Sequence, residues 1–317
     1  MPRLLILLTL PPQVREQYRA RLAARFPEVT IDMVDHYSKA GPYMSSADAL
    51  VTFGPMMKDE VLRGADQLRW VQALGTGVDN LIDLPSLRPD VIITNIRGIH
   101  GAPVSEAAIM MMLALSRDFA ASVRNQDRQA WTRWPARLLD GKTVGIFGVG
   151  QIAEGLAPRC KALGMTVVGF TSAKRELAGF DRMHERGALV AEAGSLDYLV
   201  LLAPFAEEIR NLVGARVFAA MKPTSYLINL ARGGIVDETA LLSALERGEI
   251  AGAALDVFQE EPLPAGHPLW SAKNVIITPH LGGFSDVYAE HALVTVEHNL
   301  ACFLRGDIDH MINVVRR

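Results

Sequence analysis

Cysteine is scarce in this 317-residue sequence, which contains only Cys160 and Cys302. Their separation matches no metal-ligand spacing, so we predict no metal site and a reduced, cytoplasmic setting. Long hydrophobic runs are also missing. The longest, residues 107–115, is too short to cross a bilayer, and we expect no contact with a membrane.

No excess of one charge sign is present either. The chain has 32 Lys and Arg against 35 Asp and Glu, well mixed along the sequence, with a formal net charge of −3. The lack of a basic stripe argues against a nucleic-acid partner, and the lack of long single-sign runs argues against a disordered tail. What remains is an ordinary globular composition, 50% hydrophobic, in a length that suggests two domains.

The first hundred residues alternate between short apolar runs and helical patterns. The first run, residues 4–10, has two interpretations, a short signal peptide or a buried strand. Pro11 and Pro12 follow it without a small-residue cleavage pattern, which favours a strand over residues 4–8. Further strands are predicted at 29–34, 49–53, 70–74 and 91–94, with helices at 14–26 and around 58–62. This alternation predicts βαβ units and a parallel sheet.

Residues 103–121 form the clearest helical pattern and are apolar nearly all round. A helix of this kind is normally buried, so we expect it between two bodies of structure, as a spine that joins two domains. A polar stretch, residues 124–137 with Trp131 and Trp134, follows it.

Residues 142–155, K-T-V-G-I-F-G-V-G-Q-I-A-E-G, carry the most informative pattern in the chain. A strand pattern ends at Gly148, and Gly148, Gly150 and Ala153 then form G-x-G-x-x-A at the start of a helical pattern. The first glycine allows a tight turn, the second lets a pyrophosphate approach the backbone, and the small third residue lets the helix pack closely. Unpaired N–H groups at the helix start would face the phosphates. The pattern predicts a dinucleotide-binding site.

Apolar strands recur after this motif, at residues 166–170, 198–202, 226–230, 253–257 and 275–278, with helices at 238–246 and 287–304. Near-continuous apolar strands suit a parallel sheet covered on both faces. We expect the last helix to return to the first domain, with a little edge structure at 312–315. The predicted fold class is α/β, with two Rossmann-like, doubly wound parallel-sheet domains and a cleft between them. Residues 1–98 plus 286–317 form the substrate domain, and 99–285 the dinucleotide-binding domain.

Three polar residues follow late strands, at the strand ends where ligands bind to open α/β sheets: Arg232, Glu261 and His280. Taken singly, each has a simpler explanation, namely a surface ion pair, a solvated glutamate, and a capping or core histidine. Taken together, they place three catalytic group types at the ends of three strands of one sheet. We do not expect that arrangement by chance.

Along essentially its whole length, the chain resembles the D-isomer-specific 2-hydroxyacid dehydrogenases. The motifs are G-T-G-V-D-N at 75–80, V-S-E at 104–106, G-K-T-V-G-I-F-G-V-G-Q-I-A at 141–153, I-N-L-A-R-G-G-I-V-D-E at 228–238, A-L-D-V-F-Q-E-E-P-L-P at 254–264 and N-V-I-I-T-P-H-L-G-G at 274–283. The resemblance implies an oxidoreductase that reduces a small 2-oxo acid, with glyoxylate and hydroxypyruvate as first candidates. It also implies that Arg232, Glu261 and His280 are the catalytic residues.

Chemistry assigns each of these residues a role. Arg232 would grip the substrate with its planar fork of donors, and N–H groups in the segment Leu74, Gly75, Thr76 and Gly77 would hold the other side of its carboxylate. His280, as imidazolium, would protonate the ketone oxygen while hydride arrives from the nicotinamide. Glu261 would orient the His280 ring and stabilise its charged form. For Arg97 and His100, substrate tuning, a rim salt bridge and a capping role all stay open.

The cofactor is predicted to be NADP(H), with NAD(H) possible. Thr171 stands where NAD-dependent relatives carry aspartate, and Ser172, Lys174 and Arg175 are candidates to bind a 2′-phosphate. Alternatively, Lys174 and Arg175 open a solvated helix and both cofactors work. The segment L-A-P-F-A at 202–206 departs from the family's H-x-P-L-T, which leaves its polar contacts open. The other cofactor contacts that the resemblance implies are Gly148, Gly150, Gln151, Ile152, Ala203, Pro204, Leu230, Ala231, Arg232, Asp256, His280 and Gly282. For Asp256, a purely structural role at a strand end is the alternative to a contact with the nicotinamide carboxamide.

Other functions fit the sequence less well. Formate dehydrogenases of the same superfamily carry glutamine where Glu261 stands, and a phosphoglycerate dehydrogenase with a regulatory domain would need more chain. A nucleotide-sensing binding protein would need only the nucleotide site. An NAD-preferring dehydrogenase of a bulkier 2-hydroxy acid also stays open. Because the family is usually dimeric, we expect a homodimer, with residues 103–121 and the Trp-containing stretch at its interface.

Overall fold

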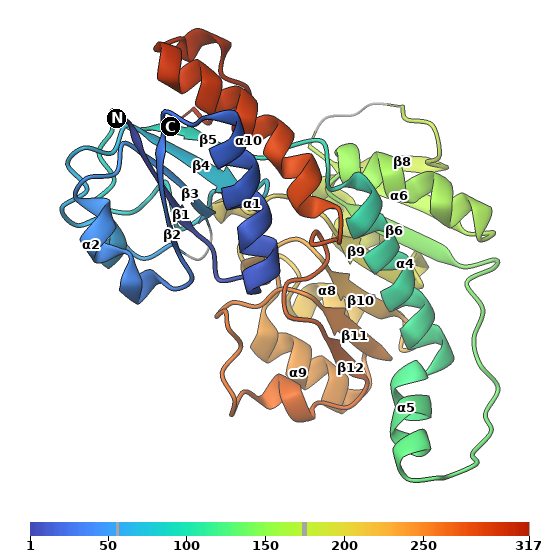
Figure 1. The fold of residues 1–317 in the computed structure, drawn as a ribbon. Coiled ribbons are helices and arrows are strands. Elements are labelled where there is room, and N and C mark those ends of the chain that lie inside the picture. Colours follow the sequence, from blue (N-terminus) through green and yellow to red (C-terminus); the bar gives the residue numbers. More distant parts are fainter. Residues whose placement is uncertain (55–56, 173–175, 317) are drawn as a thin grey trace. The chain divides into compact units, whose positions relative to one another are not determined.

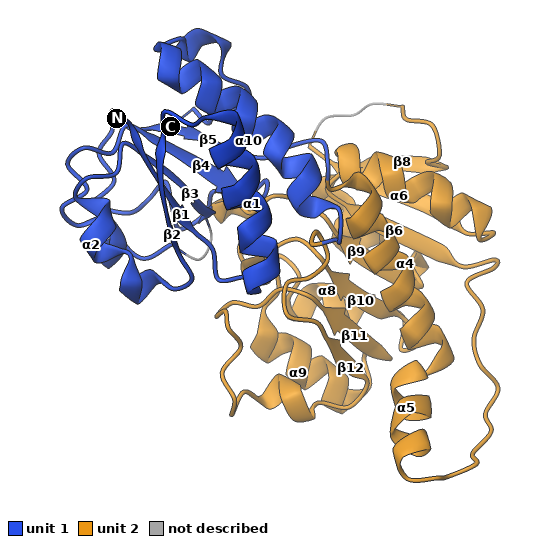
Figure 2. Cartoon of the chain, in the orientation of Figure 1, with its two compact units in different colours: residues 1–99, 285–317 blue, residues 100–284 orange. Residues whose placement is uncertain are grey.

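The computed structural model describes residues 1–54, 57–172 and 176–316 of the chain. The chain divides into two compact units (Figure 2): unit 1 comprises residues 1–99 and 285–317, and unit 2 comprises residues 100–284. Each unit is an α/β body built on its own parallel sheet. Two of the cofactor residues predicted from sequence, Lys174 and Arg175, lie outside the described residues.

Five parallel strands form the sheet of unit 1, in the order β2-β1-β3-β4-β5 (Figure 1). They are β1 (Arg3–Leu7), β2 (Thr30–Val34), β3 (Ala49–Phe53), β4 (Trp70–Leu74) and β5 (Ile92–Thr94). Successive side chains of a strand point to opposite faces, so both faces need a cover. The short helices α2 (Gly41–Met44) and α3 (Asp59–Leu62) pack on one face. The long helices α1 (Pro12–Arg25) and α10 (Tyr288–Arg305), which contact each other, cover the other.

A buried polar network ties α10 to the sheet of unit 1. Trp70 Nε1 donates to Thr94 Oγ1 at 2.8 Å, and Thr94 Oγ1 donates to Gln72 Oε1 at 2.8 Å. Asn299 of α10 donates to the same Gln72 oxygen at 3.0 Å, and its own oxygen accepts from the N–H of Ile312 at 2.9 Å. Buried polar groups are costly unless they are paired, so this network fixes where the C-terminal segment packs.

Seven parallel strands form the sheet of unit 2, in the order β12-β11-β10-β9-β6-β7-β8. They are β6 (Thr143–Phe147), β7 (Thr166–Thr171), β8 (Arg182–Glu185), β9 (Tyr198–Leu201), β10 (Tyr226–Asn229), β11 (Gly252–Leu255) and β12 (Val275–Ile277). Helices α4 (Gly101–Arg117) and α6 (Gln151–Ala162) pack on one face. Helices α7 (Leu189–Glu192), α8 (Ala215–Ala220) and α9 (Glu238–Arg247) pack on the other. The winding reverses between β6 and β9, which is where open α/β sheets bind ligands.

The predicted α/β class with two doubly wound parallel sheets is confirmed, and so is every predicted strand, within a residue or two of its predicted bounds. The edge structure expected at residues 312–315 is an antiparallel bridge between Thr94 and Val314. The edge strand β8 was not predicted, because its sequence R-M-H-E is mostly polar.

The single helix predicted over residues 103–121 is wrong in extent. It ends at Arg117 because Asp118 takes the left-handed conformation, φ 50°, and caps the helix through its N–H. A second helix, α5 (Phe119–Asp127), then begins and runs into the stretch expected to be merely polar. Burial all round is also wrong, since Met110 is 50% exposed and Leu113 is 37% exposed.

Candidate active site

The glycine motif lies at the switch point of the unit 2 sheet. Gly148 follows β6 with φ +95°, and a Cβ there would lie 2.4 Å from the backbone nitrogen of Ala203, which follows β9. Only glycine fits that position, because both the backbone conformation and the space exclude a side chain. Gly150 is the N-cap of α6, and nothing lies within 4 Å of where its Cβ would stand. The N-terminus of α6 is thus open to an anion, as a pyrophosphate requires.

The packing behind this motif explains its third position. Ala153 is fully buried in the core that α4 and α6 share with the sheet. Gly155, one half-turn further, lies 3.3 Å (from its ideal Cβ position) from the carbonyl oxygen of Gly101 in α4. Small residues therefore let α6 lie close both to α4 and to the sheet. At the start of α6, Gln151 is exposed and Ile152 is half-buried.

Arg232 follows β10 in a turn that Asn229 holds from both sides. The Asn229 side chain accepts from the N–H of Ala231 at 3.1 Å and donates to the carbonyl of Arg232 at 3.0 Å. These two hydrogen bonds form a local asparagine turn, which fixes the backbone that carries the guanidinium. Arg232 itself is half-buried and donates from Nη1 to the carbonyl of Ala231 at 2.7 Å.

Glu261 and His280 form a direct pair. His280 Nδ1 lies 2.7 Å from Glu261 Oε2, and the other carboxylate oxygen accepts from the N–H of Phe258 at 3.0 Å. Burial acts to raise the pKa of Glu261, but the hydrogen bond and charge of His280, the Phe258 N–H and the charge of Arg232 outweigh it. The net effect is a lowered pKa, so Glu261 is a carboxylate at neutral pH. The His280 side chain is 41% exposed, so its free nitrogen is accessible to a substrate.

The turn that carries His280 is held by Asp256. Its buried carboxylate accepts from the N–H groups of Leu281 and Gly282, both at 2.8 Å, and from the hydroxyl of Thr278. His280 has φ +53°, a left-handed conformation that is uncommon for residues other than glycine. Such backbone strain clusters at functional sites. Asp256 thus has the structural role left open as an alternative; its contact with the nicotinamide stays a prediction.

His100, at the N-cap position of α4, lies beside these residues. Its ring approaches within 3.1 Å of where a Cβ of Gly283 would stand, and its side chain makes no cap hydrogen bond to its helix. Burial and the positive charge of Arg232 lower the pKa of His100 to about 4. The imidazole is therefore neutral at physiological pH. The capping role considered for His100 is wrong, and because a neutral ring carries no charge for a rim salt bridge, only substrate tuning stays a prediction.

The remaining predicted cofactor residues of unit 2 lie at the same edge of the sheet. Ala203 is buried and Pro204 exposed after β9, while Leu230 and Ala231 follow β10. Thr171 is the last residue of β7 and is buried, and Ser172 beyond it is exposed. In parallel register, Thr171 pairs with Glu185 at the end of β8. This exposed carboxylate has no signal in the sequence, because β8 is mostly polar.

The substrate residues predicted in unit 1 form a loop at the end of β4. Leu74 is fully buried, Gly75 has φ +98°, and Thr76 is exposed. The side chain of Asn95 donates to the carbonyl of Thr76 at 2.6 Å, and the N–H of Ile96 donates to the carbonyl of Gly75 at 2.9 Å. The loop is therefore braced by the segment after β5. Asn95 directly follows β5, and its place after a strand is the one signal in the sequence for this role.

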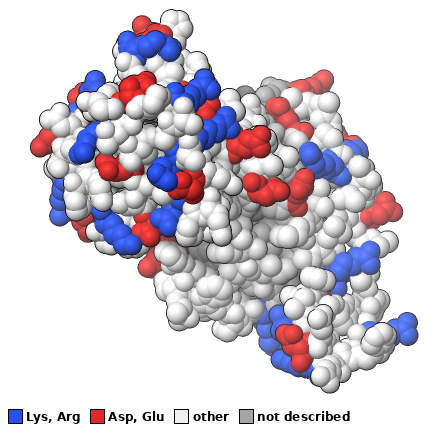
Figure 3. Space-filling model, in the orientation of Figure 1, with Lys and Arg blue, Asp and Glu red and all other residues white. Residues whose placement is uncertain are grey.

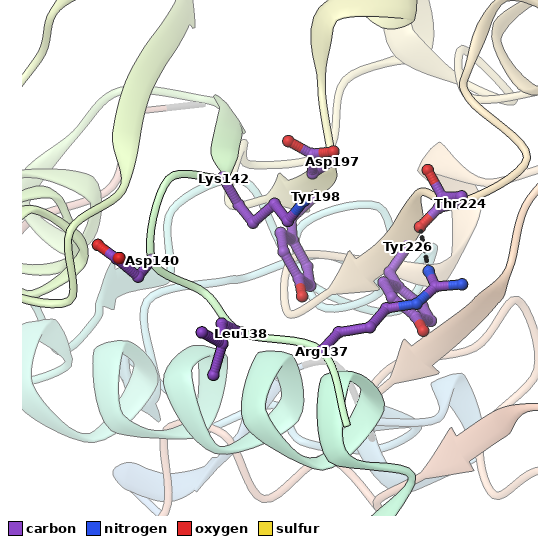
Figure 4. Close-up of a pocket in the computed structure, with 8 residues that line it drawn as sticks. All are labelled: Arg137, Leu138, Asp140, Lys142, Asp197, Tyr198, Thr224 and Tyr226. Carbon is purple, nitrogen blue, oxygen red and sulfur yellow. Dashed lines mark hydrogen bonds between the residues drawn. The ribbon is translucent and has the colours of Figure 1, made fainter. Parts of the chain in front are cut away.

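A pocket with a volume of about 460 Å³ lies at the opposite edge of the unit 2 sheet, where β6, β9 and β10 begin (Figure 4). Tyr198 and Tyr226 stack there with ring centroids 5.5 Å apart, and Arg137 donates to the carbonyl of Thr224 at 3.0 Å. Burial, as the largest cause, raises the pKa of Tyr198 to about 12. None of the residues predicted for catalysis lines this pocket, and ligands of such sheets bind at the other edge.

Among the described residues, no group of three or more His, Cys, Asp or Glu is placed to hold a metal ion. No helix in the described part of the chain is both long and apolar enough to cross a membrane. Figure 3 shows acidic and basic side chains interspersed over the visible surface of unit 1.

Comparison with known proteins agrees with this architecture. Residues 109–282 match the family model of the D-isomer specific 2-hydroxyacid dehydrogenase NAD binding domain. A glyoxylate reductase of Thermococcus gammatolerans is 34% identical over 271 residues, covering 82% of this chain and 81% of the relative. A D-3-phosphoglycerate dehydrogenase of Methanocaldococcus jannaschii is 32% identical over 279 residues, 86% of this chain but only 52% of that longer protein.

A solved structure extends the likeness to the whole chain. It is an NADPH-dependent glyoxylate/hydroxypyruvate reductase from Sinorhizobium meliloti in complex with NADP and sulfate, 29% identical, with a TM-score of 0.82 over 99% of this chain and 98% of that one. The chain thus belongs to the D-isomer specific 2-hydroxyacid dehydrogenases, a family of oxidoreductases with a nicotinamide cofactor domain.

Proposed function

We propose that this protein reduces a small 2-oxo acid of the glyoxylate or hydroxypyruvate type to the D-2-hydroxy acid, with NADPH as the preferred reductant. The observation that carries the proposal is the Glu261–His280 pair, 2.7 Å apart, at the same strand edge as Arg232 and the open glycine turn. A sensor of nucleotide would need the glycine turn alone. Relatives that bear the names glyoxylate reductase and glyoxylate/hydroxypyruvate reductase support the substrate class.

The residues of unit 2 have complementary tasks in this reaction. Arg232 binds the carboxylate and the ketone oxygen with its fork of donors, and its turn is already rigid before substrate arrives. His280 donates the proton from its free nitrogen to the ketone oxygen, while Glu261 holds the ring by Nδ1. The reduced nicotinamide of a dinucleotide held by its pyrophosphate at the glycine turn would supply the hydride. In the reverse direction His280 must accept a proton, so oxidation is favoured at higher pH. Residues 74–77 are the proposed substrate contacts of unit 1.

The preference for NADPH rests on the end of β7. Neither Thr171 nor Ser172 presents a carboxylate to repel a 2′-phosphate, and the solved relative named above is NADPH-dependent. Glu185, the register neighbour of Thr171, is the observation that argues for NADH instead. Measuring kcat/KM with NADPH and with NADH decides between them, and a clear preference for NADH contradicts the proposal.

We also propose a homodimer. Large apolar side chains are exposed along α4, α5 and the segment that follows: Met110, Leu113, Phe119, Val123, Trp131 and Leu138, with Trp131 at 95%. Exposed apolar groups concentrated in one stretch indicate a protein interface. Sedimentation equilibrium of the wild type should give twice the chain mass, and Phe119→Glu should give a monomer. A wild-type protein that sediments as a monomer at micromolar concentration rules the dimer out.

The direct test of the activity is the loss of reduced-nicotinamide absorbance with a panel of 2-oxo acids, each tried with NADPH and NADH. Turnover of glyoxylate or hydroxypyruvate is the expected result. Tight binding of the nucleotide without turnover of any acid in the panel would instead identify a nucleotide-sensing protein. Turnover confined to acids with bulkier side chains would overturn the substrate class but keep the reaction.

A further inference from the structure

Unit 2 contains a second carboxylate–imidazole pair, Glu238 and His267, which takes no part in the chemistry described above. Glu238 Oε2 lies 3.4 Å from His267 Nε2. His267 Nδ1 accepts a hydrogen bond from the N–H of Leu269 at 3.3 Å, which places the proton of a neutral ring on Nε2, facing the carboxylate. The Glu238 side chain is 11% exposed, so the pair is largely withdrawn from solvent.

Glu238 is the first residue of α9, but its carboxylate does not cap this helix. That task belongs to Asp237, the N-cap of α9, whose side chain accepts from the N–H of Ala240 at 3.0 Å. Instead, Glu238 Oε1 accepts from the N–H of Gln259 at 2.8 Å. Gln259 lies two residues before Glu261, so a buried charge at the start of α9 is bonded directly to the loop of the catalytic carboxylate.

The same loop is joined to the segment that follows Arg232. Gln259 Nε2 donates to the carbonyl of Val236 at 2.7 Å and to Asn211 Oδ1 at 3.2 Å. A Cβ on Gly233 would lie 1.9 Å from the carbonyl carbon of Phe258, so the two backbones touch and position 233 requires glycine. Glu238 lies where the segment that follows Arg232 enters α9. Its bond to Gln259 therefore holds the two segments together at this end.

We propose that Glu238, supported by His267, is a positioning residue of the active site. It holds residues 258–261 against the Arg232 segment and so keeps Glu261 within hydrogen-bonding distance of His280. An orienting carboxylate works only if its own backbone is held to within about 0.5 Å, which a charged hydrogen bond to the loop achieves. The kinetic consequence rests on the proposed function, whereas the geometric consequence does not.

The geometric test compares crystal structures of the wild type, Glu238→Ala and Glu238→Gln. In the wild type, Glu261 Oε2 and His280 Nδ1 are 2.7 Å apart. Glu238→Ala should lengthen this separation beyond about 3.5 Å, where a hydrogen bond is lost. Glu238→Gln should restore it, because the amide oxygen still accepts from the N–H of Gln259. An unchanged separation in Glu238→Ala would overturn the proposal, whether or not the protein turns over any 2-oxo acid.

The kinetic test uses the same variants with glyoxylate and NADPH. Glu238→Ala should lose about 10- to 100-fold in kcat, the usual size for removing a supporting partner, with NADPH affinity within about twofold. The pH at which turnover falls to half should move as well, since His280 loses its partner, and a mere loss of stability would not move it. Glu246→Ala, which removes an exposed glutamate of the same helix, is the matched control and should behave as wild type.

If Glu238→Ala does not fold, His267→Gln replaces it, because this change leaves the bond from Gln259 to Glu238 in place. A loss of about 3- to 10-fold in kcat, at unchanged NADPH affinity, is then expected. Wild-type kcat and pH profile in a folded Glu238→Ala or His267→Gln variant would show that the pair is only structural. Absence of turnover in the wild type would refute the proposed function and leave the structural comparison intact.

Discussion

The two units are built alike, but the segments that follow their strands differ. Both sheets are parallel, doubly wound and covered by helices on both faces. At the strand ends of unit 2, four segments present a glycine turn, a guanidinium, a carboxylate and an imidazole. The predicted segment of unit 1, residues 74–77, presents mainly backbone. Under the proposed function, one architecture hosts two tasks, and the few residues after each strand decide the task.

The interiors of the units differ in a related way. Unit 1 buries the side chains of Gln72, Thr94 and Asn299 in one hydrogen-bonded network, whereas buried polar side chains of unit 2 such as Ser225 and Asp256 bond to nearby backbone groups. Unit 1 is made from two separate stretches of chain, and the network joins them at a fixed place. The buried network of unit 1 therefore serves assembly, while Asn229 and Asp256 of unit 2 hold turns at the carboxyl ends of the strands.

The largest effect expected on the difference between the two units comes from removing the imidazole of His280 in unit 2. His280→Ala should lose about 100- to 10,000-fold in kcat, because His280 is the proposed proton donor to the ketone. NADPH affinity, measured by fluorescence titration, should stay within about twofold. His291→Ala, an exposed histidine of unit 1, is the control and should keep wild-type turnover. Near wild-type kcat in His280→Ala would show that the proton comes from elsewhere.

The buried network of unit 1 should matter for stability and not for nucleotide binding. Asn299→Leu strips hydrogen bonds from Gln72 and from the backbone of Ile312 inside the core. A cost of about 3 kcal/mol in the free energy of unfolding is expected. Urea titration measures it, and NADPH affinity of the folded variant should be unchanged. A stability loss below about 1 kcal/mol would mean that water replaces the lost partners.

The stability of unit 2 should depend on pH through the protonation of His100. Its pKa is about 4 in the folded chain, below its ordinary value, so the unfolded chain binds the extra proton first as the pH falls. Stability should therefore be unaffected above about pH 6.5 and decline between about pH 6.5 and 4. His100→Asn should abolish about 2 kcal/mol of the loss seen at pH 4.5. Parallel urea curves for both proteins at pH 7 and pH 4.5 measure the difference, and identical losses would contradict the burial of a neutral ring.

The smallest expected effect concerns the choice of cofactor. Thr171→Asp places a carboxylate at the end of β7 and should shift the ratio of kcat/KM for NADPH over NADH by about tenfold toward NADH, through repulsion of the 2′-phosphate. Glu185→Gln, which removes the neighbouring carboxylate, should shift the ratio the other way. Each variant is a single change in the wild-type chain, so the two can be compared directly. An unchanged ratio of kcat/KM for NADPH over NADH in both variants would mean that the 2′-phosphate does not bind near this strand end.

Much of the fold was predictable because its signals are local. Buried parallel strands are continuous apolar runs, and the glycine turn has a sequence that few other structures require. The features that the sequence did not predict have weak signals. β8 is a polar edge strand, and the break at Asp118 comes from one residue in a left-handed conformation. Apolar residues on α4 also suggested complete burial, whereas part of that surface is exposed in the single chain.

The proposed reactive groups of the site follow from the sequence, but the contacts that hold them do not. Arg232, Glu261 and His280 were found from their place after strands, and the structure brings Glu261 and His280 into contact. Asn229, Asn95 and the bond from Glu238 to Gln259 were missed, since hydrogen bonds between side chain and backbone depend on loop geometry. The bonds by which the Asp256 carboxylate holds the His280 turn could not be predicted for the same reason.

The left-handed backbone of His280 has a consequence for how this protein can be altered. Glycine at that position would relieve a conformational cost of about 1 kcal/mol and yield a sturdier chain with no imidazole. Selection for thermal tolerance alone would therefore favour an inert variant at residue 280, and only concurrent selection for turnover keeps the histidine.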